Sequence, residues 1–266
     1  MGVLTVGSLA MDNQRVLAQG TGRRRFLWIA ATVFAAMLVV GLVAHFLREN
    51  IDNTAPTWRG LSGLAGLLYA DGEANLWAWA SGLLLAGIGT SLAVVGFAAR
   101  HERHRGAPYF ALAALALVLS ADEIAQLHEK LARFDFDTDF TFAWLSVGVP
   151  VAIVVGLIVL WIARRIDRQL RRRLIVAGII FLLGAIGFEA LGGLVIRGQL
   201  DELARTSLPY HLLVGIEEGL EVTGALLALA ATLSALTIER TAAGILVRTR
   251  FDRVGNAALK RAPVAP

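Results

Sequence analysis

The chain has 266 residues, of which 56% are hydrophobic and 17% are charged, and its net charge is +4. Ordinary soluble domains carry about 25% charged residues, so this composition is typical of a membrane protein with several spans and disfavours a soluble domain. The chain contains no cysteine, which excludes disulfides, thiolate chemistry and cysteine-ligated metals.

Six segments are long enough to cross a hydrocarbon core of about 30 Å, which takes about 20 helical residues. Four of them are nearly free of charge, whereas the third and the sixth are interrupted by acidic residues. We therefore predict an all-α fold, a polytopic membrane bundle of six transmembrane helices. A further apolar stretch, Leu61–Tyr69, is too short to span and is predicted to be a re-entrant or interfacial helix. The predicted spans are Phe26–Leu47, Leu76–Ala99, Ala107–Leu131, Phe142–Ala163, Leu174–Ile196 and Leu208–Ile238.

The connections between these spans alternate in charge. Arginines cluster before the first span, after the second, between the fourth and fifth, and after the sixth, while the other connections are acidic or mixed. Because cytoplasmic loops are the ones enriched in Lys and Arg, both termini are predicted to be cytoplasmic. The predicted organisation is a cytoplasmic tail at residues 1–25, a six-helix transmembrane domain at 26–239 and a second cytoplasmic tail at 240–266. The expected location is the cytoplasmic (inner) membrane of a bacterium, with the protein crossing it several times.

The sixth predicted span carries three glutamates, Glu217, Glu218 and Glu221. An ionisable side chain near the middle of a bilayer costs about 2.5 to 3.5 kcal/mol, and such residues usually face a bundle interior or a water-filled cavity. Residues three and four apart share one side of a helix, so the three carboxyl groups are predicted to crowd together. His211 lies about two turns away on the same face.

Acidic residues also occur within two other predicted spans. Asp122 and Glu123 lie in the third span, followed by His128 and Glu129 toward its end. Glu189 lies in the fifth span among glycines, which allow helices to approach closely in membranes. Since an isolated acid facing lipid is costly, we expect the acids of the three spans to converge.

Depth within the spans supports this expectation. At 1.5 Å per residue, Asp122 and Glu189 lie about 22 Å from the cytoplasmic ends of their spans, and Glu218 lies about 15 Å from the outer end of its span. The spans contain no Lys or Arg at that depth, and like charges this close in a low dielectric cannot all ionise. The acids must share protons, bind cations or contact water, unless protonated acids only fix helix packing through hydrogen bonds. The predicted ion- or proton-binding residues are Asp122, Glu123, Glu189, Glu217, Glu218 and Glu221.

A metal ion is one candidate occupant of this cluster. Oxygen and imidazole ligands without thiolates suit Mg, Mn, Fe or Zn rather than Cu(I). The Glu-x-x-His pair of di-iron bundles is absent from the sequence, so the spacing does not identify one metal. The candidate metal ligands are His128, Glu129, His211, Glu218 and Glu221.

Two short motifs resemble known families. The sequence Glu218-Gly219-Leu220-Glu221 resembles the Arg-Glu-Gly-Leu-Glu motif of iron permeases, whose glutamates are implicated in passing iron, although Glu217 replaces the arginine and the motif occurs once. The order Ser120-Ala-Asp-Glu, His128-Glu129 and a later Glu-Glu-x-x-Glu helix resembles a family of uncharacterised bacterial multispan membrane proteins. The first resemblance implies cation handling, and the second implies no activity.

Three functions are compatible with these residues. The leading hypothesis is a metal or proton-coupled cation transporter. The alternative is an intramembrane metal-dependent enzyme that opens to the outer face, with a glutamate acting as general base toward a metal-activated water. The second alternative is a non-catalytic accessory subunit whose polar cluster contacts partner helices. The expected partners are the lipid bilayer and a small cation or small molecule, with no nucleic acid; an oligomer is compatible with the sequence.

Overall fold

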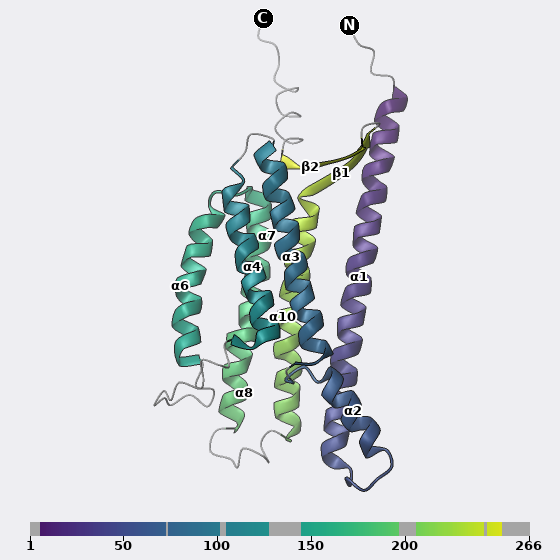
Figure 1. Ribbon diagram of the computed structural model, residues 1–266, viewed down its shortest axis with the longest axis vertical. Helices are drawn as coiled ribbons and strands as arrows, with labels where there is room; N and C mark the ends of the chain where they lie inside the picture. The colour runs from purple at the N-terminus through teal and green to yellow at the C-terminus, as the bar shows by residue number, and fades with distance from the viewer. Residues whose placement is uncertain are drawn as a thin grey trace, which may run out of the picture.

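The computed structural model describes residues 6–72, 74–101, 105–127, 145–196, 206–241 and 244–251, and over these residues the protein is mostly helical. The long helices run up and down along the long axis of the molecule (Figure 1). One segment, η1, is a π-helical insertion that joins α7 and α8 into a continuous helix. The elements are α1 (Val6–Asn50), α2 (Trp58–Leu68), α3 (Leu76–His101), α4 (Ala107–Ala125), α6 (Leu145–Ala163), α7 (Arg168–Leu182), η1 (Leu183–Phe188), α8 (Glu189–Ile196), α10 (Leu208–Ser234), β1 (Leu236–Thr241) and β2 (Gly244–Thr249).

Four helices in the described residues are long and apolar enough to cross a membrane. A fifth apolar helix, within α6, is shorter. The 27-residue α10 is long enough, but each stretch of 18 residues within it contains all three glutamates. Every predicted span overlaps a helix of the structure. The four long apolar helices cover Gly20–Asn50, Leu76–His101, Ala107–Ala125 and Arg168–Leu194.

Two predicted spans end earlier than expected. α4 was predicted to continue to Leu131 but ends at Ala125, because Gln126 adopts a left-handed conformation (φ 54°, ψ 46°) and its N–H bonds to the Asp122 carbonyl. α10 was predicted to continue to Ile238 but ends at Ser234. Residues 128–144, which include the rest of the predicted third span, lie outside the described part of the chain.

The chain after α10 forms an antiparallel β-hairpin rather than more helix, so the all-α prediction missed one element. β1 pairs with β2 from Leu236 opposite Thr249 to Thr241 opposite Gly244. Leu236 to Glu239 alternate apolar and polar residues, and both strands contain β-branched side chains, which favour extended backbone. At the other terminus, the residues predicted to form a tail are helical from Val6 onward.

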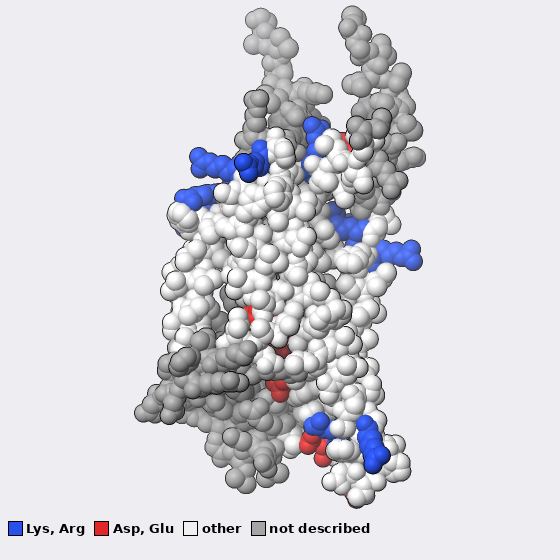
Figure 2. All heavy atoms as spheres, viewed as in Figure 1, with Lys and Arg blue, Asp and Glu red and all other residues white. Residues whose placement is uncertain are grey.

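The two ends of the molecule differ in charge. The start of α7, the end of α10 and the residues after β2 meet at one end, where the Arg250 amide donates to the Ala235 carbonyl oxygen and the Arg173 side chain donates to the Ser234 hydroxyl. Figure 2 shows Lys and Arg side chains around this upper end and along the upper part of α1. At the lower end, next to α2, acidic and basic side chains lie side by side (Figure 2).

Glycines allow α3 and α4 to pack closely. Three glycines of α3, spaced seven residues apart, face α4. A Cβ on Gly82 would lie 2.7 Å from Cγ1 of Ile124, and a Cβ on Gly89 would lie 2.8 Å from Cγ of Leu117. The hydroxyl of Ser120 donates a 2.7 Å hydrogen bond to the Gly82 carbonyl oxygen. The three glycines are Gly82, Gly89 and Gly96.

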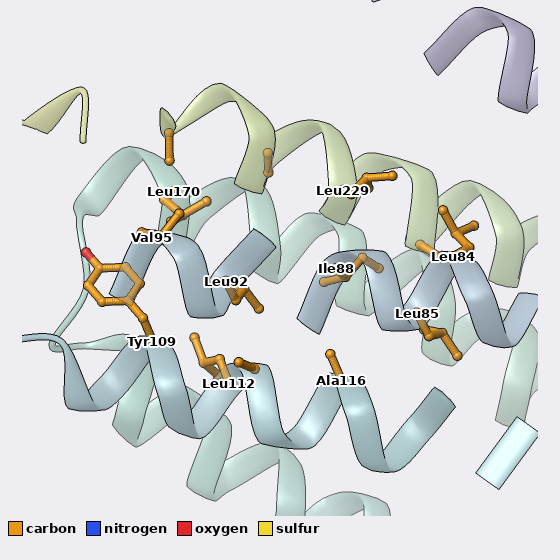
Figure 3. Close-up of a cluster of buried hydrophobic side chains, with 14 of the residues drawn as sticks. Leu84, Leu85, Ile88, Leu92, Val95, Tyr109, Leu112, Ala116, Leu170 and Leu229 are labelled. Carbon is orange, nitrogen blue, oxygen red and sulfur yellow. The ribbon is translucent and has the colours of Figure 1, made fainter. Parts of the chain in front are cut away.

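A second close pair consists of α10 and the continuous helix α7–η1–α8. A Cβ on Gly224 would lie 2.7 Å from the carbonyl oxygen of Ala177, and a Cβ on Gly184 would lie 2.6 Å from the carbonyl oxygen of Glu217. Between the two helix pairs lies an apolar core, in which side chains from α3, α4, α7 and α10 point toward one another (Figure 3). This core runs from Leu170 and Ala235 near the arginine-rich end to Trp77 and Ala70 near α2, so it also lies alongside the acidic residues.

Candidate functional site

The three glutamates of α10 lie in the interior of the bundle. Glu217, Glu218 and Glu221 are each partly buried, on a stretch of α10 that faces α1, α3 and η1. The glycines before and between them permit this packing: a Cβ on Gly215 would lie 2.8 Å from Cδ1 of Leu42 in α1. The acidic half of α10 thus contacts helices on several sides, while Leu212 and Ile216 on the same stretch remain exposed.

Two of these glutamates line a small cavity between four helices. Its volume is about 10 Å³, about the size that admits one water molecule. Three carboxyl groups, from α4 and α10, face apolar side chains across it, so the polar partners of an ion or water in the cavity would be oxygen atoms. The lining residues are Ser81, Leu84, Leu85, Glu123, Phe181, Glu218, Glu221, Val222 and Ala225.

Two polar groups of α3 lie at the cavity: one bonds to a glutamate that lines it, and the other lines it directly. The indole Nε1–H of Trp77 donates a 2.8 Å hydrogen bond to Oε2 of Glu218, and Trp77 is only 1% exposed. One turn along α3, the hydroxyl of Ser81 lines the cavity, is buried, and has no hydrogen-bond partner among the described residues. A buried polar atom without a partner is costly, and a water or cation in the cavity would satisfy it.

Acids from three helices lie close enough for their charges to interact. The carboxyl group of Glu221 interacts electrostatically with those of Glu218, Glu123, Glu217 and Glu189. All five groups carry the same charge when ionised, so they cannot all be ionised together in a low-dielectric interior. The arrangement therefore favours shared protons or a bound cation.

The series of acids continues toward the end of the molecule at α2. Glu217 interacts with Glu189 on one side and with the exposed Asp71 on the other. Asp71 itself accepts a 3.1 Å hydrogen bond from the Tyr210 hydroxyl. Carboxyl groups thus extend from an exposed position to the cavity.

The π-helical turn sets the position of Glu189. η1 covers six residues and ends at Phe188, directly before this glutamate. A π-turn inserts an extra residue and shifts the following side chains around the helix, and such turns occur frequently at functional sites. The same turn includes Gly184, where the backbone contacts α10 between Glu217 and Glu221. Close packing and the shifted register together bring Glu189 near the α10 acids.

The remaining predicted site residues lie elsewhere. Asp122 is partly buried but does not line the cavity, although its neighbour Glu123 does. His128 and Glu129 lie outside the described residues. Within the described part of the chain, no group of three or more His, Asp and Glu side chains is arranged to hold a metal ion.

His211 belongs to a different cluster from the one predicted. It is 3% exposed, and its Nδ1 lies 3.3 Å from the Tyr69 hydroxyl. The ring of Tyr69 stacks on His45 with centroids 3.8 Å apart, and the two imidazoles are 5.1 Å apart. In the structure His211 thus contacts α1 and the residue after α2 rather than Glu218, because two helical turns, about 10 Å, separate the two side chains along α10.

Sequence reasoning overlooked Trp77 and Ser81. In a long apolar segment, both were indistinguishable from ordinary packing or interfacial residues. Their four-residue spacing places them on one face of α3; Ser81 and Leu85 line the cavity, and Trp77 bonds to Glu218, which also lines it. The available signal in the sequence was the pair of polar side chains at helical spacing in an otherwise apolar span.

These observations define the class of the protein: a mostly helical bundle whose long apolar helices are compatible with a membrane protein. Residues 26–236 match the model of a family described as a domain of unknown function (DUF8692), and the chain belongs to this family. The predicted resemblance to an uncharacterised family is thereby confirmed. No curated protein and no solved structure matches the chain.

Proposed function

We propose that the protein is a six-span membrane protein that carries cations across the bilayer on its buried carboxyl groups. The six spans are the four long apolar helices together with α6 and α10. α6 has 19 residues and is about 28 Å long, and α10 has 27 residues and is about 40 Å long, so α6 matches a hydrocarbon core of about 30 Å and α10 is more than long enough to cross it.

The orientation in this proposal follows from the arginine-rich end. The connections that meet there carry most of the described arginines, whereas the α2 end is mixed in charge (Figure 2). Under the positive-inside rule the arginine-rich end is cytoplasmic, so both termini are cytoplasmic and the acids lie in the middle-to-outer half. The spans then occupy residues 26–239 of a bacterial inner-membrane protein, with tails at 1–25 and 240–266.

The observation that carries the proposal is the water-sized cavity lined by Glu123, Glu218 and Glu221. A network that only fixed helix packing would fill this space and pair its polar atoms, yet the Ser81 hydroxyl is left without a partner in the described residues. The small volume supports a proton, one water or one dehydrated cation as occupant rather than an organic substrate.

The series of acids supports access from the outer side. Asp71, Glu217 and the cavity glutamates provide successive carboxyl groups between which a proton or cation can pass. On the cytoplasmic side of the cavity, the route is filled by the apolar core of Figure 3. In this proposal the protein is a carrier whose site is reached first from the outer side, since transport requires alternating access to a fixed site.

Flux measurements in liposomes test the proposal. Full-length protein is reconstituted with a pH-sensitive dye inside, a potassium diffusion potential is imposed, and proton entry is followed. Parallel vesicles contain a dye for divalent metals and receive Fe, Mn, Zn or Mg outside. We expect Glu221→Gln to abolish the flux of whichever cation the wild type carries, because it keeps size and hydrogen bonding but removes the exchangeable charge.

The matched control is Asp52→Asn, which removes one exposed acid at the α2 end, away from the cavity. It should retain wild-type flux. Wild-type protein that moves neither protons nor metals would overturn the proposal. Equal loss of flux in both variants would show that surface charge, rather than the cavity, limits transport.

A further inference from the structure

A large cleft lies at the arginine-rich end of the bundle, remote from the carboxyl cluster. Its volume is about 840 Å³, which is within the range of small-molecule sites in proteins. Residues from the start of α7, the end of α10 and the chain after β2 form its walls. They are Asp167, Arg168, Gln169, Leu170, Arg172, Arg173, Ser234, Ala235, Arg250 and Phe251.

Specific contacts hold the walls in place. Nη1 of Arg173 donates a 2.8 Å hydrogen bond to the Ser234 hydroxyl, which fixes α7 to the end of α10. The Arg250 amide donates to the Ala235 carbonyl oxygen at 2.9 Å, which fixes the chain after the hairpin. The ring of Phe251 lies nearly parallel to that of Tyr109, 6.0 Å away. The cleft is therefore a built feature rather than a gap between unconnected side chains.

The charge of the cleft is strongly unbalanced. Four of the residues that line it are arginines. The single acid is Asp167, whose Oδ1 accepts hydrogen bonds from the backbone N–H groups of Gln169 and Leu170 at the start of α7. In the described part of the chain, none of the four guanidinium groups forms an ion pair with a carboxylate. A fifth arginine, Arg23 of α1, donates to the Leu233 carbonyl oxygen and lies near enough to Arg173 and Arg250 for their charges to repel.

We propose that this cleft binds a phosphate group. Guanidinium groups form paired, charge-assisted hydrogen bonds with phosphate oxygens, and several arginines around one anion would offset their mutual repulsion. Basic pockets between helices at the cytoplasmic side of membrane proteins are also where anionic lipid headgroups bind. The phosphate belongs either to an anionic lipid of the inner leaflet or to a soluble phosphate compound, and the two share the same recognition chemistry.

Binding titrations on the purified full-length protein in a neutral detergent test this inference. Three probes are used: short-chain phosphatidylglycerol, short-chain phosphatidylcholine and inorganic phosphate. Phosphatidylcholine carries a phosphate whose charge is balanced by choline, so it serves as the lipid control. Tight binding of phosphatidylglycerol alone identifies a lipid site, and binding of inorganic phosphate identifies a site for a soluble compound.

Variants locate the binding in the cleft. Arg173→Gln with Arg250→Gln should weaken binding of the preferred probe by roughly tenfold or more, because each charge-assisted bond lost is a large fraction of the affinity. Arg168→Gln with Arg172→Gln removes two exposed arginines of the same cleft and should have the same direction of effect, which protects the test if the first variant fails to fold. The matched control is Arg100→Gln with Arg105→Gln, which removes two charges from the same end of the molecule outside the cleft.

The inference does not depend on cation transport, since no flux is measured. Loss of binding in the cleft variants with retention in the control supports it. Absence of binding for phosphatidylglycerol and inorganic phosphate in the wild type would overturn it. Equal weakening in cleft and control variants would also overturn it, because the general positive charge of this end would then account for the binding.

Discussion

The two halves of α10 both pack closely against the α7–η1 helix but differ in chemistry. The half from Tyr210 to Glu221 carries three carboxyl groups, and the half from Val222 to Ser234 is almost entirely apolar. Both halves contact the α7–η1 helix through a glycine at backbone distance, Gly184 in one case and Gly224 in the other.

This comparison shows that the acids are not a sign of loose packing. If they occurred only where helices separate, the Gly184 contact would not bring the backbone of Glu217 so close to η1. The acidic half instead combines a tight backbone interface with a cavity about the size of one water. We therefore expect the two halves to respond alike to changes in packing and differently to changes in polarity.

The largest effect is expected when the backbone contacts are broken. Gly184→Val and Gly224→Val should each lower the free energy of unfolding by about 3 kcal/mol, because the new side chains overlap backbone atoms of the facing helix. The measurement is the midpoint temperature for loss of monodisperse protein in detergent. Gly178→Val is the control, since a Cβ there meets nothing within 4 Å. A large effect at Gly224 alone would show that the acidic half is loosely packed.

A second test separates packing from polarity. Leu229→Ala in the apolar half should lower the free energy of unfolding by about 2 kcal/mol, the low end for a buried leucine, because lipid is as apolar as the core and only packing is lost. Its cation flux should persist. Glu221→Gln should leave the midpoint unchanged or higher, since it removes like-charge repulsion, while flux is lost. Loss of stability without loss of flux in Glu221→Gln would make the acidic half a packing network.

The hydrogen bond between Trp77 and Glu218 should contribute less. Trp77→Phe keeps most of the ring packing but removes the indole donor, and we expect it to cost about 1 kcal/mol and to slow flux. Trp79→Phe on the same helix is the control, because Trp79 is 54% exposed and should tolerate the change. Equal effects of the two substitutions would show that the Trp77–Glu218 hydrogen bond contributes neither to stability nor to flux.

The smallest effect is expected at the buried polar pair of the apolar half. The Thr232 hydroxyl lies 3.3 Å from the Ser91 hydroxyl and also donates to the Leu229 carbonyl oxygen of its own helix. Thr232→Val keeps the shape, so we expect a cost near 0.6 kcal/mol, the average for such bonds in membrane helices. Flux should be unchanged. A marked loss of flux would place this pair on the cation route and extend the polar region into the apolar half.

Much of the helical framework could be predicted from the sequence because long apolar runs are a strong signal. Each predicted span overlaps a helix, and Leu61–Tyr69 lies almost wholly within α2. The ends were less predictable. At the end of α10 the apolar run continues through Ile238, so hydrophobicity concealed the change from helical to alternating periodicity that marks β1.

The candidate site was predictable in part for a related reason. Acidic residues in apolar segments stand out because placing them in a membrane is energetically costly. Glu123, Glu189 and the α10 glutamates could therefore be named as site candidates from the sequence. Trp77 and Ser81 carry no charge and have no such signal. The placement of His211 beside His45 depends on how α1 packs on α10, which spacing along one helix cannot provide.

The heptad spacing of the α3 glycines has a consequence for motion. α3 and α4 pack closely through Gly82, Gly89 and Gly96 and form one block. α10 and the α7–η1 helix pack closely through Gly184 and Gly224 and form a second block. Between the blocks the described glycine contact is looser, since a Cβ on Gly87 would lie 3.9 Å from Cδ1 of Leu229, and the Trp77–Glu218 and Ser91–Thr232 hydrogen bonds connect the two blocks. The cavity lies on this seam, with Ser81 and Glu123 on one block and Glu218 and Glu221 on the other. A hinge that parts the seam would therefore pull the carboxyl groups of α10 away from that of Glu123 while leaving each block intact.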